Sequence, residues 1–189
     1  MHLHVHISQG IIIAMLFLPS LSFLEVILVV AFPFLIDFDF LLSKYAQNRN
    51  HRRLITHSLI PYSLLLVFGI FFPICLILGI CGVVHILSDV IDWGTALFSP
   101  LYREPLGGIL PKPPSTIIEI PDYRKRQCWF AKTYHNSRII TGLDIFFGAA
   151  AILLIIIINI LYIWLIAFYL IFLILHLNFY LKCIKGKLG

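Results

Sequence analysis

The sequence predicts an all-α integral membrane protein, a helical bundle that we expect to contain three helical hairpins. Of the 189 residues, 60% are hydrophobic and only 12% are charged, which is too apolar for a soluble domain. Three apolar runs, at 11–36, 59–91 and 143–181, are each long enough to enter or cross a bilayer core about 30 Å thick. Backbone groups in hydrocarbon must pair within their own segment, which favours helices over strands.

Each apolar run contains a plausible turn or kink near its middle. The three breaks are Pro19-Ser20, Phe72-Pro73 and Asn159. If the breaks are kinks, the chain has three long spans, and its loops at 37–58 and 93–142 lie on opposite faces of the membrane. If the breaks are turns, the chain has three hairpins, and both loops and both termini share one face.

The basic residues favour the hairpins, because Lys and Arg accumulate in short loops on the cytoplasmic side. All fourteen lie in polar segments away from the breaks: Lys44, Arg49, Arg52, Arg53, Arg103, Lys112, Arg124, Lys125, Arg126, Lys132, Arg138, Lys182, Lys185 and Lys187. Hairpins put all of them on one face, whereas kinked spans would separate the two loops. We therefore expect a multi-pass protein of the cell membrane whose polar loops face the cytoplasm. A piece such as 59–72, about 21 Å long as a helix, falls short of a span, so some helices are expected to be short or re-entrant.

Composition along the chain divides it into three regions. Residues 1–105 form a membrane-embedded region that carries the candidate site, 106–138 a Pro-rich and basic cytoplasmic loop, and 139–189 a C-terminal transmembrane hairpin with a basic tail. The net charge of +5 comes from basic clusters at the ends of the apolar runs. This distribution suits anionic head groups, so membrane lipids are the expected partners, and no nucleic-acid partner is expected.

The four cysteines predict neither a zinc ribbon nor a disulfide framework. Cys75, Cys81, Cys128 and Cys183 are widely spaced and contain no CxxC pair. We expect them to be packing residues.

Acidic residues and histidines gather at the ends of the apolar runs. Asp37 and Asp39 end the first run, and His51 and His57 precede the second. His85 and Asp89 are four residues apart near the end of the second run, so they lie on one helical face with the spacing of metal ligands.

A hairpin would bring these residues together. His57 and His85 would be about 42 Å apart on one straight helix, because 28 residues separate them. A turn near Pro73 removes this separation and returns His85 to the edge that holds His57 and the two aspartates. His6, best placed of the alternating His2, His4 and His6, would return to the same edge.

A divalent cation is the expected partner of these groups. A charged carboxylate at the centre of a membrane helix costs about 2.5–3.5 kcal/mol, less near its ends, so an offsetting charge is needed. The predicted ligands are His6, Asp37, Asp39, His51, His57, His85 and Asp89, with Asp39 preferred over Asp37. Mixed His and Asp ligands suit Zn²⁺, with Mn²⁺ or Fe²⁺ as alternatives. Such a metal lowers the pKa of its bound water towards about 7 and supplies a nucleophile.

The combined pattern resembles the YdjM-like membrane-bound metal-dependent hydrolases. The resemblance rests on Asp37-Phe38-Asp39, on His51-Arg52 followed by Thr56-His57-Ser58, and on His85-x-x-x-Asp89, and it covers roughly residues 1–105. The chain departs from the family pattern at Arg53-Leu54-Ile55, where a small residue such as Gly is common. The family is distantly similar to zinc-dependent phospholipases C and S1/P1-type nucleases, which implies hydrolysis of a phosphoester.

The leading hypothesis is therefore a hydrolase that acts on a phosphoester or lipid-linked substrate, with Arg52 binding a phosphate or a carboxylate and stabilising developing charge. A metal-ion transporter or channel and a membrane scaffold with a structural metal are the alternatives. Several of these polar residues also have purely structural interpretations. Ser58 or Thr56 can cap the next helix, and His135 and Asp144 suit an interface. His176 suits a packed position inside the last apolar run.

Overall fold

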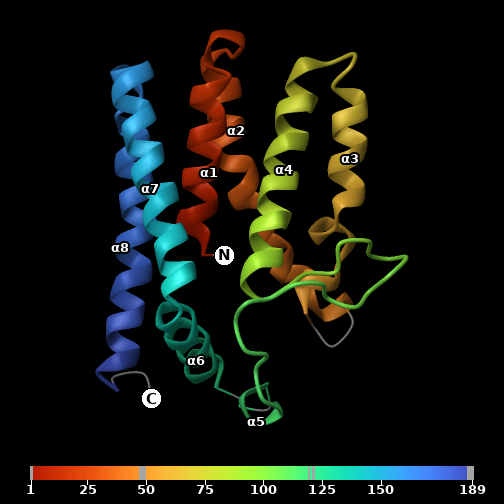
Figure 1. The fold of residues 1–189 in the computed structure, drawn as a ribbon, viewed down its shortest axis with the longest axis vertical. Helices are drawn as coiled ribbons and strands as arrows, with labels where there is room; N and C mark the ends of the chain where they lie inside the picture. The colour runs from red at the N-terminus through yellow and green to blue at the C-terminus, as the bar shows by residue number, and fades with distance from the viewer. Residues whose placement is uncertain (1, 47–49, 119, 121, 187–189) are drawn as a thin grey trace.

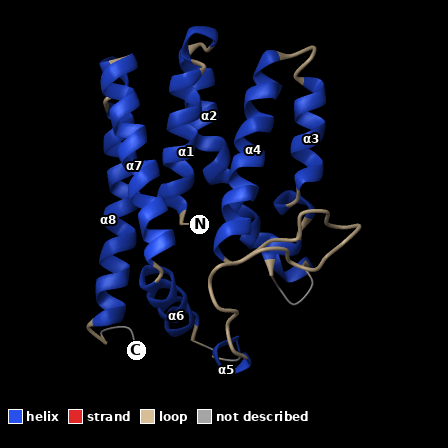
Figure 2. Cartoon of the chain, viewed as in Figure 1, coloured by secondary structure: helices blue, strands red, loops and turns tan. Residues whose placement is uncertain are grey.

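The computed structural model describes residues 2–46, 50–118, 120 and 122–186, and helices dominate these ranges (Figures 1 and 2). Within the described ranges no strand forms, and extended backbone pairs only at two isolated bridges, Thr95 with Leu106 and Phe98 with Tyr102. The predicted all-α bundle is confirmed. Arg49 and Lys187, which the sequence analysis counted among the basic residues, lie outside the described residues.

The helices follow one another as α1 (Leu3–Leu16), α2 (Phe23–Ile36), α3 (Leu59–Phe68), α4 (Pro73–Asp92), α5 (Ser115–Ile118), α6 (Tyr123–Asn136), α7 (Arg138–Ile158) and α8 (Trp164–Ile184). Short 3-10 helices lie between them: η1 (Leu18–Ser20), η2 (Asp37–Tyr45), η4 (His51–Arg53), η5 (Ile55–His57) and η6 (Ile160–Tyr162). The segment η2 continues directly from α2.

Three helical hairpins form, as predicted: α1 with α2, α3 with α4, and α7 with α8. Pro19 lies in η1, and Pro73 is the first residue of α4, where a missing N–H costs nothing. Asn159 ends α7, and its side chain accepts a hydrogen bond from Leu161 N. The three turns lie at one end of the bundle, and the polar segments lie at the other (Figure 1).

Helix α1 is the central helix of the bundle, because it contacts α2, α4, α7 and α8. Its polar side chains are consequently buried on all sides, including His4, His6, Ser8 and Gln9. The first apolar run begins at residue 11, whereas α1 begins at Leu3. The polar start of this helix is buried by its neighbours, which hydropathy cannot detect.

Among the residues that the structure describes, four helical segments are long and apolar enough to cross a membrane: Phe23–Tyr45, Pro73–Asp92, Arg138–Ile158 and Ile160–Ile184. Helices α1 and α3 are also apolar but have only 14 and 10 residues. At about 1.5 Å per residue they reach about 21 and 15 Å, which is less than a bilayer core. The predicted mixture of spans and short helices is therefore present.

Helix α3 packs very closely on α4 because Gly82 has no side chain. A Cβ added at Gly82 would lie 2.0 Å from the ring of Tyr62, so no larger residue fits unless that ring or α3 moves. Tyr62 also donates a hydrogen bond to the carbonyl of Thr56 at 2.5 Å. This contact ties α3 to the segment that carries His57.

The loop after α4 folds back along the end of that helix. Backbone N–H groups of Gly108, Ile109 and Leu110 donate to the carbonyls of Val90, Ile91 and Asp92 at 2.7–2.9 Å. These carbonyls have no partners within their own helix, so the loop supplies the missing hydrogen bonds. The end of α4, where Asp89 and Asp92 lie, is thereby held in place.

Helix α6 lies inside the region that the sequence analysis described as a Pro-rich and basic loop, 106–138. Asp122 caps this helix, because its side chain accepts from Arg124 N and Lys125 N. The helix is polar, so it lacks the apolar run that reveals the other long helices. Ser137 then ends α6 and caps α7 through a hydrogen bond from Ile140 N.

The expectation that all four cysteines only pack was wrong for two of them. Cys128 of α6 and Cys183 of α8 form a disulfide, with Cα atoms 5.3 Å apart and 55 residues between them in sequence. The pairing depends on α6 lying against α8, and sequence spacing carries no sign of it. Cys75 and Cys81 are free thiols, and Cys81 is buried.

Candidate metal centre

The predicted ligands converge from five elements. His6 lies in α1, Asp37 and Asp39 in η2, His51 in η4, His57 in η5, and His85 and Asp89 in α4. Two groups of these side chains have ligand atoms close enough to hold a cation: His6, Asp37, His85 and Asp89, and Asp37, His51 and His57. Asp37 belongs to both groups. We call the combined set the metal centre.

The middle of the metal centre is formed by His57 and His85 with two carboxylates. His57 Nε2 lies 3.4 Å from His85 Nε2, 3.5 Å from Asp37 Oδ1 and 3.4 Å from Asp89 Oδ2. His85 Nε2 lies 3.8 and 3.9 Å from the same two oxygens. Around a tetrahedral zinc ion, ligand atoms are about 3.3–3.6 Å apart. The spacing therefore fits a shared cation after small adjustments.

His6 is held in the orientation that a metal ligand needs. Its Nδ1 donates to Gln9 Oε1 at 3.1 Å, and Gln9 Nε2 donates to Ser88 Oγ at 2.5 Å. This hydrogen bond leaves the lone pair of a neutral His6 on Nε2. That buried atom makes no hydrogen bond.

The lone pair of His6 faces negative charge. Its Nε2 lies 3.6 Å from Asp37 Oδ2 and 3.5 Å from Asp89 Oδ1. A lone pair opposite two carboxylates is unfavourable unless a cation or a proton lies between them. The unpartnered Nε2 of His6 and the facing carboxylates of Asp37 and Asp89 thus fit a divalent cation.

Both oxygens of Asp37 face imidazoles, but different ones. Oδ1 faces His57 and His85, and Oδ2 faces His6. A carboxylate with this arrangement can bridge two cations. The side chain of Asp37 is 15% exposed, whereas those of His6, His57, His85 and Asp89 are fully buried. Asp37 is thus on the side from which the metal centre can be reached.

Asp39, the preferred ligand in the sequence analysis, belongs to neither group of candidate ligands. Its Oδ2 accepts from His57 Nδ1 at 2.6 Å and from Thr56 Oγ1. A carboxylate on the far nitrogen of a ligating histidine fixes the ring and makes it a stronger ligand. The geometry favours Asp39 as a residue that orients His57.

The electrostatics of His57 reflect its acidic surroundings. Burial alone would lower the pKa of His57, but hydrogen bonds to Asp37 and Asp39 outweigh this effect and raise the pKa well above its usual value. The carboxylates therefore attract a positive charge to this position.

His51 lies at the outer side of the metal centre, with its ring centroid 4.9 Å from that of His57. Burial, the neighbouring His57 and the charge of Arg52 lower the pKa of His51 to about 4. A neutral imidazole at pH 7 can offer its lone pair to a metal, so this state suits a ligand.

Arg52 binds carboxylates of α4. Its guanidinium donates to both oxygens of Asp92, at 2.5 and 3.1 Å, and lies 3.4 Å from Asp89 Oδ1. Burial lowers the pKa of Arg52, but the carboxylates of Asp89 and Asp92 outweigh it and raise the pKa above its usual value. The fork of Arg52 thus fixes η4 against the end of α4.

The segment that carries His51 and His57 has little regular structure, so hydrogen bonds from the loop after α4 hold it. Thr95 Oγ1 donates to the carbonyls of Arg52 and His57, and Ser99 Oγ donates to that of Arg53. Ser58 then caps α3 by accepting from Ile60 N, as the sequence allowed.

Sequence reasoning missed the two residues that support His6. Gln9 is three residues after His6, and Ser88 is three after His85, so each lies on the same helical face as a candidate ligand. That spacing is the sequence feature from which their role could have been predicted. His4, by contrast, lies away from the metal centre, with Nε2 3.6 Å from Asp144 Oδ2.

Comparisons of the chain with protein-family models, with curated proteins and with solved structures found no match. The resemblance to the YdjM-like hydrolases thus rests on the motifs alone. The metal centre is the feature from which a function can be argued.

Proposed function

We propose that the chain is a membrane-bound metal-dependent hydrolase that acts on a phosphoester or lipid-linked substrate. The observation that carries this proposal is Asp37, which belongs to both groups of candidate ligands. Its Oδ2 faces His6, and its Oδ1 faces His57 and His85. A centre with a bridging carboxylate suits two cations, an arrangement that recurs in phosphoester hydrolysis.

Each residue of the metal centre has a distinct role in this proposal. His6, Asp37, His51, His57, His85 and Asp89 would hold one or two divalent cations, with Zn²⁺ favoured by the mixed nitrogen and oxygen donors. A bound divalent cation polarises a phosphoryl oxygen and lowers the pKa of water. Asp39 keeps His57 in its orientation. Arg52 is a positioning residue here, because Asp92 occupies its fork.

An apolar pocket beside the metal centre supports a lipid-linked substrate. It has a cavity volume of about 520 Å³ and is lined by Phe32, Leu35, Ile36, Phe38, Asp39, Leu41, Leu42, Thr56 and Tyr62. Leu35, Phe38 and Leu41 are 42–64% exposed, so the pocket opens at the surface of a membrane-spanning segment. An acyl chain entering there would bring its head group to the side of Asp39.

A second cavity, of about 200 Å³, is suited to an anionic head group. Arg53 and Arg103 both line it, together with Tyr45 and Ser99. Two guanidinium groups are good partners for phosphate. Leu54 and Ile55 also line this cavity, and the next residue, Thr56, lines the apolar pocket.

The second candidate function is a scaffold with a structural metal. It is favoured by the burial of His6, His57 and His85, whose relative exposure is zero, since closed coordination is typical of structural sites. The partial exposure of Asp37 and His51 separates the two candidates, because a hydrolase needs an open position on that side.

The orientation in the membrane is also part of the proposal. The basic residues at the loop end favour a cytoplasmic position for the metal centre. The disulfide between Cys128 and Cys183 joins segments near the same end, and disulfides usually form outside the cytosol. The number of basic residues outweighs one disulfide, and we therefore assign the loop end to the cytoplasm.

The activity is tested by release of phosphate or head group from a panel of phospholipids and phosphodiesters. Purified protein should be active, inactive after chelation, and active again after return of Zn²⁺ or Mn²⁺. Asp37→Asn should lower the rate at least about 100-fold, because the amide cannot bridge two cations. Metal-loaded protein that hydrolyses nothing in the panel would favour the scaffold.

A further inference from the structure

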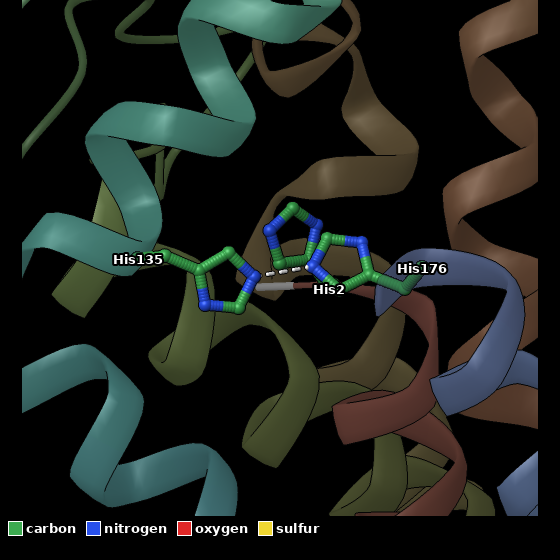
Figure 3. A group of neighbouring side chains, drawn as sticks. All are labelled: His2, His135 and His176. Carbon is green, nitrogen blue, oxygen red and sulfur yellow. Dashed lines mark hydrogen bonds between the residues drawn. The ribbon is translucent and has the colours of Figure 1, made fainter. Parts of the chain in front are cut away.

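A second group of imidazoles lies apart from the metal centre, where the N-terminal segment meets α6 and α8 (Figure 3). His2 directly precedes α1, His135 is in the last turn of α6, and His176 is in α8. One nitrogen of each ring can be chosen so that all three lie within 4.8 Å of one another. We call these residues the three-histidine cluster.

The three rings are in direct contact. His135 Nε2 and His176 Nε2 are 2.8 Å apart, and the ring centroids of His2 and His176 are 3.8 Å apart. His2 Nε2 is buried and makes no hydrogen bond. Leaving a buried polar atom without a partner is costly, so the cluster has an unused binding capacity.

The packing of α6 on α8 holds two of the histidines in place. Cys128 lies seven residues before His135, and Cys183 lies seven residues after His176. Seven residues are about two helical turns. The disulfide and the histidine pair therefore join the same faces of two antiparallel helices, two turns apart. Two potential ligands are thereby positioned before any ligand binds.

We propose that His2, His135 and His176 form a second metal site, which takes Zn²⁺ or another divalent ion that prefers imidazole nitrogen. Imidazole suits zinc, copper and nickel, whereas Mg²⁺ and Ca²⁺ require oxygen ligands. The nearby carboxylate of Asp144 is already engaged by the hydroxyl of Tyr134 at 2.7 Å. Three protein nitrogens leave a fourth coordination position for water or another small ligand.

The geometry requires only a small adjustment. Zinc–nitrogen bonds of about 2.0–2.1 Å put two ligand nitrogens about 3.3–3.4 Å apart. His135 and His176 must therefore separate by about 0.5 Å from their present 2.8 Å. Both side chains are only partly buried, so side-chain rotation can provide this movement.

A cation here would also affect the metal centre. His2 lies four residues before His6, which is about one helical turn. The first turn of α1 and the residue before it thus carry one ligand for each site. Binding at the three-histidine cluster would fix this end of α1 and reduce the freedom of His6.

The test counts Zn²⁺ bound by the purified full chain in detergent, by equilibrium titration followed by elemental analysis. His2→Gln is the main variant, because His2 precedes α1 and the change alters no residue within a helix. His176→Gln is the second variant. Each should lose one equivalent of Zn²⁺, or bind it more than about 100-fold more weakly, since even a residue that only orients a ligand changes metal affinity about 10–100-fold.

The matched control is His4→Gln, because His4 is near the cluster, with its ring centroid 5.1 Å from that of His176, but is not one of its three ligands. His4→Gln should bind as much Zn²⁺ as the unchanged chain. Equal Zn²⁺ binding by the unchanged chain and by His2→Gln would overturn the proposal. So would an equal loss in His4→Gln, or displacement of this equivalent by millimolar Mg²⁺.

Discussion

His57 and His85 are 28 residues apart in the chain, yet their Nε2 atoms lie 3.4 Å apart in the folded protein. On one straight helix the two residues would be about 42 Å apart. The chain reversal before Pro73 is therefore what creates the metal centre. Any change that separates α3 from α4 should disturb it.

Gly82→Ala tests this dependence on packing. The new methyl group would meet the ring of Tyr62, so we expect a destabilisation of about 1–3 kcal/mol and weaker metal retention. Gly142→Ala is the matched control, because beyond the adjacent residues and the nearby backbone of its own helix no atom lies within 4 Å of the added Cβ. It should stabilise α7 by up to about 1 kcal/mol. Thermal unfolding in detergent measures both, and equal stability of the two variants would argue against the close packing.

Asp39→Asn tests whether Asp39 orients His57. The amide keeps the shape but can no longer accept a charged hydrogen bond from His57 Nδ1. We expect metal affinity to fall about 10–100-fold, as for other residues that orient a ligand. Competition with a chelating dye measures the affinity. Complete loss of the metal would instead identify Asp39 as a ligand, as the sequence analysis preferred.

Arg52→Met tests the buried ion pair with Asp92. The side chain of Arg52 is 12% exposed and that of Asp92 is 1% exposed, so removal of one partner should cost about 3–5 kcal/mol. Arg52→Met combined with Asp92→Leu should recover much of this loss. The free energy of unfolding in detergent is the measurement.

Arg53→Met is the control for the ion pair. Its partner Glu104 is 62% exposed, so the change should cost less than about 1 kcal/mol. Equal effects of Arg52→Met and Arg53→Met would contradict the role assigned to Arg52.

Much of the fold could be predicted because a backbone in lipid must form its hydrogen bonds internally, which restricts the possible structures. Long apolar runs interrupted at Pro19, Pro73 and Asn159, with basic residues only in the polar segments, were sufficient to predict three hairpins. Helix α6 was missed because it is polar and has no apolar run. The disulfide was missed because it depends on two helices meeting.

The candidate site was predictable where ligands are close in sequence. The pair of His85 and Asp89 follows from helical spacing alone. Sequence spacing could not show that Asp37 is placed as a ligand and Asp39 as a residue that orients His57. That difference depends on which carboxylate oxygen faces which imidazole. The three-histidine cluster could not be predicted from the sequence either. His176 lies in an apolar run and His135 in a polar one, and only the packing of α6 on α8 brings them together.

Single cysteines at Ser20 and Lys112 test the topology, in a background where Cys75 and Cys81 are replaced by Ala. Ser20 lies in the turn between α1 and α2, and Lys112 is two residues after Leu110, whose N–H donates to Asp92 at the end of α4. We expect an impermeant thiol reagent on intact cells to label the cysteine at position 20 and not the one at 112. Labelling of both from outside would refute the arrangement, and the reverse pattern would reverse the orientation.

The most direct measurement is the metal content of the purified chain in the His2→Gln background, where the three-histidine cluster is disabled. We predict at least one equivalent of divalent metal, and its loss in Asp37→Asn, because both groups of candidate ligands share Asp37. Asp144→Asn, a change in another buried carboxylate outside both groups, should keep the metal. No metal after incubation with Zn²⁺, Mn²⁺ or Fe²⁺, or full occupancy in Asp37→Asn, would contradict the metal centre.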